Sequence, residues 1–293
     1  MKALWGTLGS RKSAPWLIAE NGTTLPQHPQ DSPLAISGLT VGYGTKPVLF
    51  SIDFFTPPKA MVAIVGPNGA GKSTLIKAAL GIVPRISGEV TVFGEPYECA
   101  RQRIAYMPQR ASVDWDFPAT VLDVVLMGLY REIGAFRFAG ARHRQVAIDC
   151  LERVGMGGLA KRQIGQLSGG QQQRVFLARA LAQHADLYIM DEPFAGVDAA
   201  TERAIIGVLK ELNAQGKTII CVHHDLATVP AYFDHVLLLN GTKIADGPVE
   251  STFTAENLQK TYGGRLATAQ IETLTPGALA SSEMPAPFSE HRP

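Results

Sequence analysis

The feature that most constrains the fold of this 293-residue chain is a glycine-rich segment that directly follows the apolar run Met61–Val65. The segment reads Gly66-Pro67-Asn68-Gly69-Ala70-Gly71-Lys72-Ser73-Thr74. It fits the pattern G-x-x-x-x-G-K-[ST] at every fixed position. Glycines let backbone N–H groups approach phosphates closely, and a helix N-terminus attracts anions. The pattern therefore predicts a buried strand, a phosphate-binding loop and a helix over residues 72–80.

Two side chains of this segment have predicted roles. Lys72 should reach the β- and γ-phosphates of a bound nucleoside triphosphate, and Ser73 should place its hydroxyl on Mg²⁺. The alternative is a glycine-rich turn that matches the pattern by chance. The apolar strand before the segment and the helix after it, which should stop at Gly81, argue against that alternative.

A pair of carboxylates ends a second apolar run, residues 187–190. Asp191 closes this predicted strand, which should lie beside the phosphate loop, and a carboxylate there can hold Mg²⁺ directly or through water. Glu192 follows and is placed to orient and polarise an attacking water. An isolated Asp-Glu pair usually marks only a helix start or a loop, so the phosphate loop upstream is what favours the catalytic interpretation.

A second candidate anion site is the string Leu167-Ser168-Gly169-Gly170-Gln171, called here the signature segment. Ser168 can cap a helix over about residues 171–183, and the glycines leave the N-terminus of that helix open to an anion. Alone, the string indicates only a capped helix start. Together with the phosphate loop, the signature segment gives the chain two helix ends that can bind an anion. A triphosphate binds at the phosphate loop, so the second helix end has no ligand assigned to it within the same chain.

Composition excludes several classes of protein. The formal net charge is +1, so the chain has no broad basic field that would indicate a nucleic-acid partner. Its three cysteines are far apart, which excludes a disulfide framework and fits a reducing compartment. No run reaches the roughly 18 apolar residues that a membrane helix needs, and no secretory signal is visible. We expect a cytoplasmic protein that other subunits hold at any membrane.

Strands and helices alternate along residues 34–266, which predicts a parallel sheet with helices on both of its faces. Residues 236–245 are expected to form a hairpin, and residues 111–166 an inserted helical subdomain. Residues 1–33 should form a flexible leader. Residues 267–293 are rich in Pro, Ser, Ala and Thr and should form a disordered tail.

The phosphate loop, the signature segment and Asp191-Glu192-Pro193, in this order, resemble the ATP-binding subunits of ABC transporters over about residues 34–265. The resemblance implies an α/β fold of the P-loop NTPase (RecA-like) type, an ABC cassette with an antiparallel β subdomain and an inserted helical subdomain. In that family the glutamate of the last motif activates water. Two cassettes, as a homodimer or a paired cassette, pack head to tail and enclose two ATP molecules with Mg²⁺. The residues that would complete the partner's ATP site are Ser168, Gly169, Gly170, Gln171 and Asp198.

Single residues extend the resemblance. Tyr43 matches the aromatic residue that stacks on adenine. Gln109 matches the glutamine that touches Mg²⁺ and water and senses the membrane subunit. His224 follows the apolar run 218–222, a further predicted strand, and matches the switch histidine near the γ-phosphate. Its neighbour His223 should point to the other side of the strand, and a packed core histidine is the alternative for either residue.

The segment after Gln109, residues 113–130, resembles the importers of manganese, zinc or iron. In the family this region receives a coupling helix of the membrane subunit. The resemblance therefore implies integral membrane permease subunits, an extracytoplasmic solute-binding protein that acts indirectly, and a peripheral position on the cytoplasmic face of the inner membrane. The groove should be formed by Trp115, Phe117, Val121, Val124 and Val125, while Asp114 and Asp116 could meet basic residues on the coupling helix.

Several alternatives stay open at this point. Residues 113–130 could instead be the core of a subdomain, and the chain could serve an importer of another solute. A non-transport ABC ATPase acting in DNA repair or on ribosomes would carry a coiled-coil insertion or two cassettes, and neither is visible. The intact set Lys72, Asp191, Glu192 and His224 argues against an inactive nucleotide-binding regulator. Exporters usually fuse the cassette to membrane helices, and the sequence predicts none.

Overall fold

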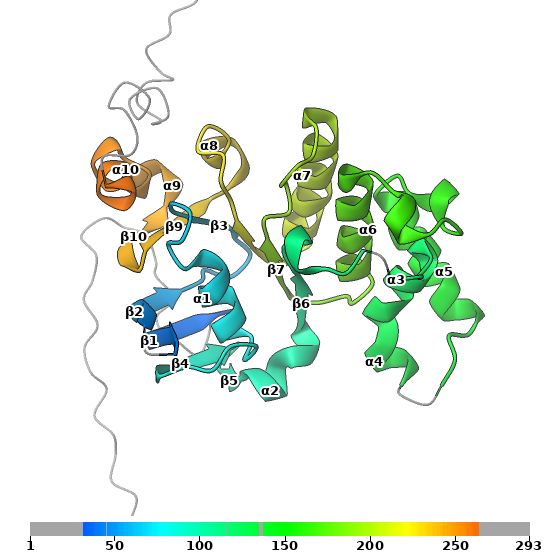
Figure 1. Ribbon diagram of the computed structural model, residues 1–293, viewed down its shortest axis with the longest axis horizontal. Coiled ribbons are helices and arrows are strands. Elements are labelled where there is room, and N and C mark those ends of the chain that lie inside the picture. The colour runs from blue at the N-terminus through cyan, green and yellow to red at the C-terminus, as the bar shows by residue number, and fades with distance from the viewer. Residues whose placement is uncertain (1–31, 45, 116, 135–136, 264–293) are drawn as a thin grey trace, which may run out of the picture.

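The computed structural model describes residues 32–44, 46–115, 117–134 and 137–263 (Figure 1). The expected tail, and the expected leader apart from its last two residues, lie outside the described residues, as does Asp116. Ser32 is buried, and its hydroxyl oxygen lies 2.7 Å from the carbonyl oxygen of Leu34 and 2.8 Å from that of Thr56. The packed domain therefore takes in Ser32, two residues before the predicted boundary.

A six-stranded sheet runs through the molecule and positions the phosphate loop (Figure 1). In spatial order its strands are β10 (Thr242–Pro248), β9 (His235–Asn240), β3 (Met61–Val65), β8 (Thr218–Val222), β7 (Leu187–Asp191) and β6 (Ile104–Met107). All neighbours pair in parallel except β10 with β9, which form the predicted hairpin. Every residue of β3, β7 and β8 is buried, which explains their continuous apolar runs. The carboxyl ends of these three strands meet at one edge, so the residues that follow them lie together.

Helix α1 (Lys72–Ala79) follows the phosphate loop and packs against a second sheet, which is antiparallel (Figure 1). This sheet has the order β2 (Lys46–Phe55), β1 (Ala35–Tyr43), β4 (Ser87–Val92) and β5 (Glu95–Pro96). One buried hydrophobic cluster joins Leu39 of β1, Ile64 of β3 and Leu75 of α1. The antiparallel sheet thus holds α1, and with it the loop, against the parallel sheet.

Helices form the other half of the molecule, including the inserted subdomain (Figure 1). They are α3 (Val121–Leu126), α4 (Tyr130–Ile133), α5 (Ala141–Arg153), α6 (Gly169–Leu181) and α7 (Ala199–Ala214). The prediction that Val121, Val124 and Val125 line a docking groove is wrong, because they are at most 6% exposed and belong to the core that α3 shares with α5 and α6. Phe117, by contrast, is 56% exposed.

The remaining helices are short. They are α2 (Tyr97–Ala100), α8 (Val229–Tyr232), α9 (Val249–Thr252) and α10 (Ala255–Tyr262). Helix α10 packs beside β9, and the side-chain amide of Asn240 donates to the carbonyl of Thr261 (2.9 Å). Within the described part of the chain, no helix is both long and apolar enough to cross a membrane.

Candidate nucleotide-binding site

The phosphate loop is held in place by close backbone contacts. A Cβ atom on Gly66 would lie 2.0 Å from the carbonyl oxygen of Leu239, so the neighbouring strand leaves no room for a side chain. Gly71 caps α1 with a φ of +94°, a left-handed conformation that favours glycine. The N–H of Gly241, in the β9–β10 turn, donates to the carbonyl of Ala70 (3.0 Å). The loop is therefore fixed at the N-terminus of α1, where backbone N–H groups favour an anion.

Lys72 carries a positive charge into this loop. It is 5% exposed, and its ammonium donates to the carbonyls of Gly66 (2.8 Å) and Pro67 (3.0 Å). Burial lowers the pKa of Lys72, while the carboxylates of Glu192 and Asp191 act in the opposite direction. A phosphate in the loop would supply a charged acceptor for this buried ammonium.

Ser73 and Asp191 form a pair of oxygen ligands at the start of α1 and the end of β7. The Ser73 hydroxyl donates to Oδ1 of Asp191 (2.9 Å). Asp191 is fully buried, and its Oδ2 atom has no hydrogen-bond partner among the described residues. Burial raises the pKa of Asp191, and the bond from Ser73 opposes that rise. A buried carboxylate oxygen without a donor is costly, and a hard divalent cation held by these two side chains would satisfy it.

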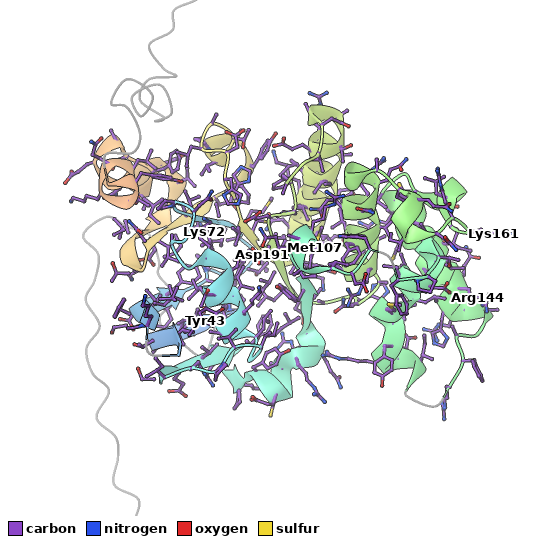
Figure 2. All side chains as sticks on the ribbon, in the orientation of Figure 1. Tyr43, Lys72, Met107, Arg144, Lys161 and Asp191 are labelled. Atoms are coloured by element: carbon purple, nitrogen blue, oxygen red, sulfur yellow. The ribbon has the colours of Figure 1, made fainter. Side chains whose placement is uncertain are left out.

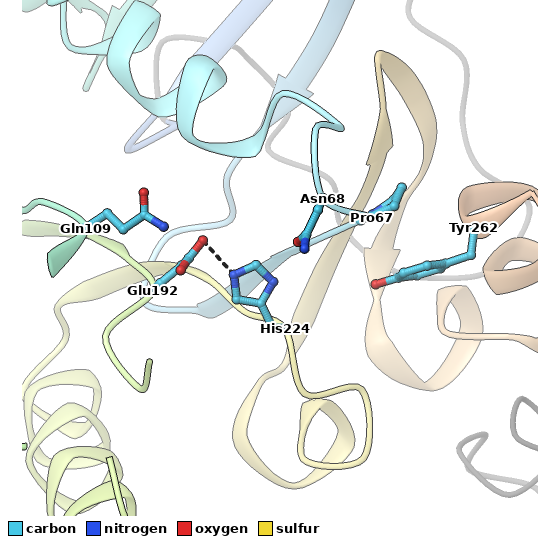
Figure 3. Close-up of a pocket in the computed structure, with 7 residues that line it drawn as sticks. Pro67, Asn68, Gln109, Glu192, His224 and Tyr262 are labelled. Atoms are coloured by element: carbon cyan, nitrogen blue, oxygen red, sulfur yellow. Dashed lines mark ion pairs between the residues drawn. The ribbon is translucent and has the colours of Figure 1, made fainter. Parts of the chain in front are cut away.

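Glu192 and His224 face one another across the same edge of the sheet. Oε1 of Glu192 lies 2.6 Å from Nε2 of His224, and the two side chains are 14% and 40% exposed (Figure 3). Glu192 has a φ of +59°, which is uncommon for a residue other than glycine. The amide of Gln173, on α6, donates to the Glu192 carbonyl (3.4 Å). A conformation of this kind is maintained only by its surroundings, and such residues are concentrated at functional sites.

An open cavity of about 680 Å³ lies between the start of the phosphate loop and the Glu192–His224 pair (Figure 3). It is lined by Gly66, Pro67, Asn68, Gln109, Glu192, His224 and Tyr262. Figure 3 shows Gln109 beside Glu192, and Tyr262 at the opposite side beyond Pro67. Sequence reasoning missed Tyr262, whose one signal is an aromatic residue at the end of a short helix that is mostly polar. Burial raises the pKa of Tyr262 to about 12, so its hydroxyl keeps its proton at neutral pH.

Of the residues predicted to bind ATP in the same chain, the lining includes Gly66, Pro67 and Asn68, while Tyr43 and residues 69–74 lie outside it. Tyr43 ends β1 and is 55% exposed, and Figure 2 shows it well apart from Lys72 and Asp191. Thr74 is buried in the first turn of α1. The cavity therefore joins the start of the phosphate loop to Gln109, Glu192 and His224, while Tyr43 stands on the antiparallel sheet, where a base could extend away from them.

The signature segment forms a separate surface. Ser168 caps α6, since its hydroxyl accepts from the N–H of Gln171 (3.4 Å) and its own N–H donates to the Gln171 side chain (3.0 Å). Asp198 caps α7 by accepting from the N–H of Thr201 (2.8 Å). A Cβ atom on Gly170 would lie 3.4 Å from the Thr201 hydroxyl, so the two helix starts are neighbours. In the described part of the chain, none of these residues lines the cavity.

His223 and His224 diverge, as predicted. His223 is 3% exposed, its Nε2 lies 2.7 Å from the hydroxyl of Thr228, and its ring packs 5.3 Å from that of Phe194 and 5.2 Å from that of Phe233. Burial lowers the pKa of His223 to about 4. His223 is therefore a packed core histidine, and His224 is the one that reaches the cavity.

Comparison with known sequences identifies many relatives. A family model described as ABC transporter matches residues 49–195. The manganese transport system ATP-binding protein MntB of Bacillus subtilis is 58% identical over 245 residues, which cover 84% of this chain and 98% of the relative. The zinc transport system ATP-binding protein TroB of Treponema pallidum is 58% identical over 232 residues, 79% of this chain and 87% of the relative.

Solved structures give the same result at lower identity. A nucleotide-free ATP-binding cassette from an ABC transporter matches with a TM-score of 0.67 and 26% identity, over 82% of this chain and 98% of that one. The protein cbiO1 from Clostridium perfringens, part of the ABC transporter complex cbiONQ, matches with a TM-score of 0.65 and 29% identity, over 80% of this chain and 96% of that one.

Proposed function

This chain belongs to the family of ABC transporter ATP-binding subunits, and we propose that it hydrolyses ATP to drive import of a transition-metal cation through a separate membrane permease. The observation that carries the hydrolytic part is the meeting of Lys72, Asp191, Glu192 and His224 at one edge of the sheet around the phosphate loop. These residues combine a phosphate cradle, a candidate cation ligand and a carboxylate that can accept a proton.

Mg²⁺ is the cation that this donor set fits. Ser73 and Asp191 would hold it, with Gln109 at the rim of the cavity. When bound, Mg²⁺ neutralises charge on the β- and γ-phosphates. The buried Asp191 Oδ2 atom, which has no donor among the described residues, is the observation that supports this assignment.

Glu192 would act on the attacking water. Its carboxylate accepts a proton as the water oxygen bonds to the γ-phosphorus. The bond from the γ-phosphorus to the β–γ bridging oxygen breaks in the same step, so ADP leaves with that electron pair, and His224 holds one oxygen of the Glu192 carboxylate in position. Lys72 turns its ammonium from the loop carbonyls to the phosphates, and the backbone N–H groups of the loop hold the anion while it reacts. Tyr43 would stack on adenine from the antiparallel sheet.

A second cassette would complete the site. Ser168, Gly169, Gly170 and Gln171 open an anion-binding helix end that the cavity of the same chain does not use, and Asp198 lies on the same surface. A two-fold dimer of this chain, or a pair with a related cassette, brings that surface to the partner's phosphates. Each ATP is then held between two subunits.

The choice of manganese or zinc, with iron as a further candidate, rests on the named functions of the relatives at 58% identity. The permease would dock near residues 113–130, and an extracytoplasmic solute-binding protein would deliver the metal to the permease. The cassette would then sit on the cytoplasmic face of the membrane as a peripheral subunit. Other solutes are the alternative cargo.

Uptake measurements test the proposal. Cells that lack the chain should accumulate less radiolabelled manganese or zinc, and the wild-type chain should restore accumulation. Glu192→Gln should not restore it, although the variant is made at the same level. Normal uptake of manganese, zinc and iron in the deficient cells, together with failure of an organic solute to enter, would overturn the metal assignment and leave the ATPase assignment standing.

A further inference from the structure

Arg110, which directly follows Gln109, reaches from the edge of the parallel sheet to the start of the signature helix α6. Its Nε donates to the side-chain oxygen of Gln172 (3.0 Å). A Cβ atom on Gly169 would lie 3.2 Å from Cζ of Arg110, closer than nine in ten real Cβ contacts. The guanidinium therefore packs directly on the backbone of the signature segment, the part of α6 that faces phosphate in the proposed dimer.

Gln172 gives this contact a rigid base. It is 3% exposed, and its amide donates to the carbonyl of Ile164 (3.3 Å), just before the signature segment. Because both polar ends of the Gln172 side chain are used, the position of Arg110 is tied to the first turn of α6 rather than to a mobile surface group.

The backbone of Arg110 is tied to the helical subdomain as well. Its carbonyl accepts from the indole N–H of Trp115 (3.0 Å) and from the N–H of Val113 (3.2 Å). The Trp115 ring in turn lies 5.0 Å from the ring of Phe176 on α6. The segment after Gln109 thus holds α6 at two places, through Gln172 in the first turn and through Phe176 one turn further on.

The charge of Arg110 has one favourable contact near α6, because its Cζ lies over the Trp115 ring, 5.8 Å from the ring centroid. A cation is unfavourable near the positive N-terminal end of a helix, and the first turn of α6 contains no acidic residue. The helix end therefore does not attract Arg110. The guanidinium is held there by the bond to Gln172, by the Trp115 ring, by the turn that ends at Trp115 and by the absence of a side chain on Gly169.

We propose that Arg110 is a positioning residue that couples the segment after Gln109 to the signature segment of its own chain. A displacement at Gln109 or Trp115 then moves the phosphate-facing end of α6. This inference rests on the proposed function, in which that end completes the ATP site of the partner subunit. Its consequence is specific: loss of Arg110 impairs the ATP site of the partner, and leaves the phosphate loop of its own chain intact.

Heterodimers of the full chain with its membrane subunits test this consequence. The first chain carries Lys72→Ala, which disables its phosphate loop, and the second carries Ser168→Arg, which disables its signature segment. One active ATP site remains, and it combines the phosphate loop of the second chain with the signature segment of the first. Arg110→Ala in the Lys72→Ala chain should lower kcat for ATP about tenfold, with KM changed less than twofold. The same substitution in the Ser168→Arg chain should leave kcat within twofold. Equal loss in both placements, loss only in the second, or no loss in either overturns the proposal.

Two further variants separate positioning from charge. Arg110→Lys keeps the cation but lacks the planar fork that meets Gln172 and Gly169, so it should be as defective as Arg110→Ala. Rescue by lysine overturns the positioning role in favour of simple attraction to phosphate. The matched control is Arg144→Ala, at the far edge of the helical subdomain in Figure 2, which should leave kcat unchanged in either placement.

A measurement on the single chain keeps the test independent of the dimer. If the parent heterodimer recovers no activity although it forms, the composite ATP site of the proposed function is what fails. Hydrogen exchange then decides the role of Arg110. Arg110→Ala should speed exchange of the Gln171 and Gln172 amides at least fivefold, while Arg144→Ala should not. Unchanged exchange in Arg110→Ala overturns the proposal.

Discussion

Acidification should destabilise the folded chain through His223. The imidazole is 3% exposed and lies among the rings of Phe194, Tyr232 and Phe233, with its Nε2 against the Thr228 hydroxyl. Burial lowers the pKa of His223 from 6.5 to about 4; the nearby Asp225 opposes the shift and His224 adds to it. The folded state therefore holds the neutral imidazole, whereas the unfolded chain binds a proton near pH 6.5.

The sign and the size of the effect follow from proton linkage. Because the folded pKa is the lower one, the stability contribution of His223 is complete above pH 6.5 and is lost as the pH falls from 6.5 toward 4. The full shift corresponds to about 3 kcal/mol, and about 2 kcal/mol of it should be lost by pH 5.

Urea unfolding between pH 5 and pH 8 measures this loss. His223→Gln keeps a polar group for Thr228 but does not titrate, so the stability difference between wild type and variant should narrow by about 2 kcal/mol from pH 7.5 to pH 5. His184→Gln, at an exposed histidine, is the control and should follow the wild-type slope. Parallel pH profiles for wild type and His223→Gln would refute the reasoning.

Two further substitutions probe the loop and the docking region. Gly66→Ala should destabilise the chain by about 1–3 kcal/mol and weaken ATP binding, because its Cβ would meet a backbone oxygen at 2.0 Å. The control Gly207→Ala has open space around its Cβ and should be neutral or stabilising. Equal melting temperatures for the two variants would contradict this prediction. Phe117→Ala should leave the melting temperature unchanged and weaken permease assembly by about 2 kcal/mol, while Trp115→Ala, which loses its packing on Phe176, should lower the melting temperature as well. Unimpaired co-purification of Phe117→Ala with the permease would remove Phe117 from the docking surface.

The parallel sheet could be predicted closely from the sequence. The strands expected over residues 187–190 and 218–222 and over Met61–Val65 are confirmed to within one residue, since strands buried on both faces leave unbroken apolar runs. The sequence also predicts that Ser168 caps the following helix, and the cap is confirmed. Apolar runs and the glycine or serine residues at their ends are local features of a single segment, so they can be read from the sequence without knowledge of the fold.

The features that the sequence did not predict depend on contacts between segments that are far apart in the chain. The burial of Val121, Val124 and Val125 depends on how α3 meets α5 and α6, and their local pattern is the same for a core face and for a docking groove. The contacts of Arg110 with Gly169, and of Tyr262 with the cavity, join segments far apart in the chain. No local pattern specifies such pairs, because they arise from packing of distant elements.

Single-turnover hydrolysis of radiolabelled ATP by Glu192→Gln is the most direct test of the central claim. That claim is that the Glu192 carboxylate activates water, whereas the phosphate loop binds ATP without help from this carboxylate. The glutamine keeps the shape of Glu192 and cannot accept the proton, so the hydrolysis rate should fall by roughly 10²–10⁴. ATP binding should persist, and an ATP-bound dimer should accumulate. Glu256→Gln, on the exposed side of α10, should hydrolyse ATP at the wild-type rate. Near-normal turnover by Glu192→Gln would contradict the account.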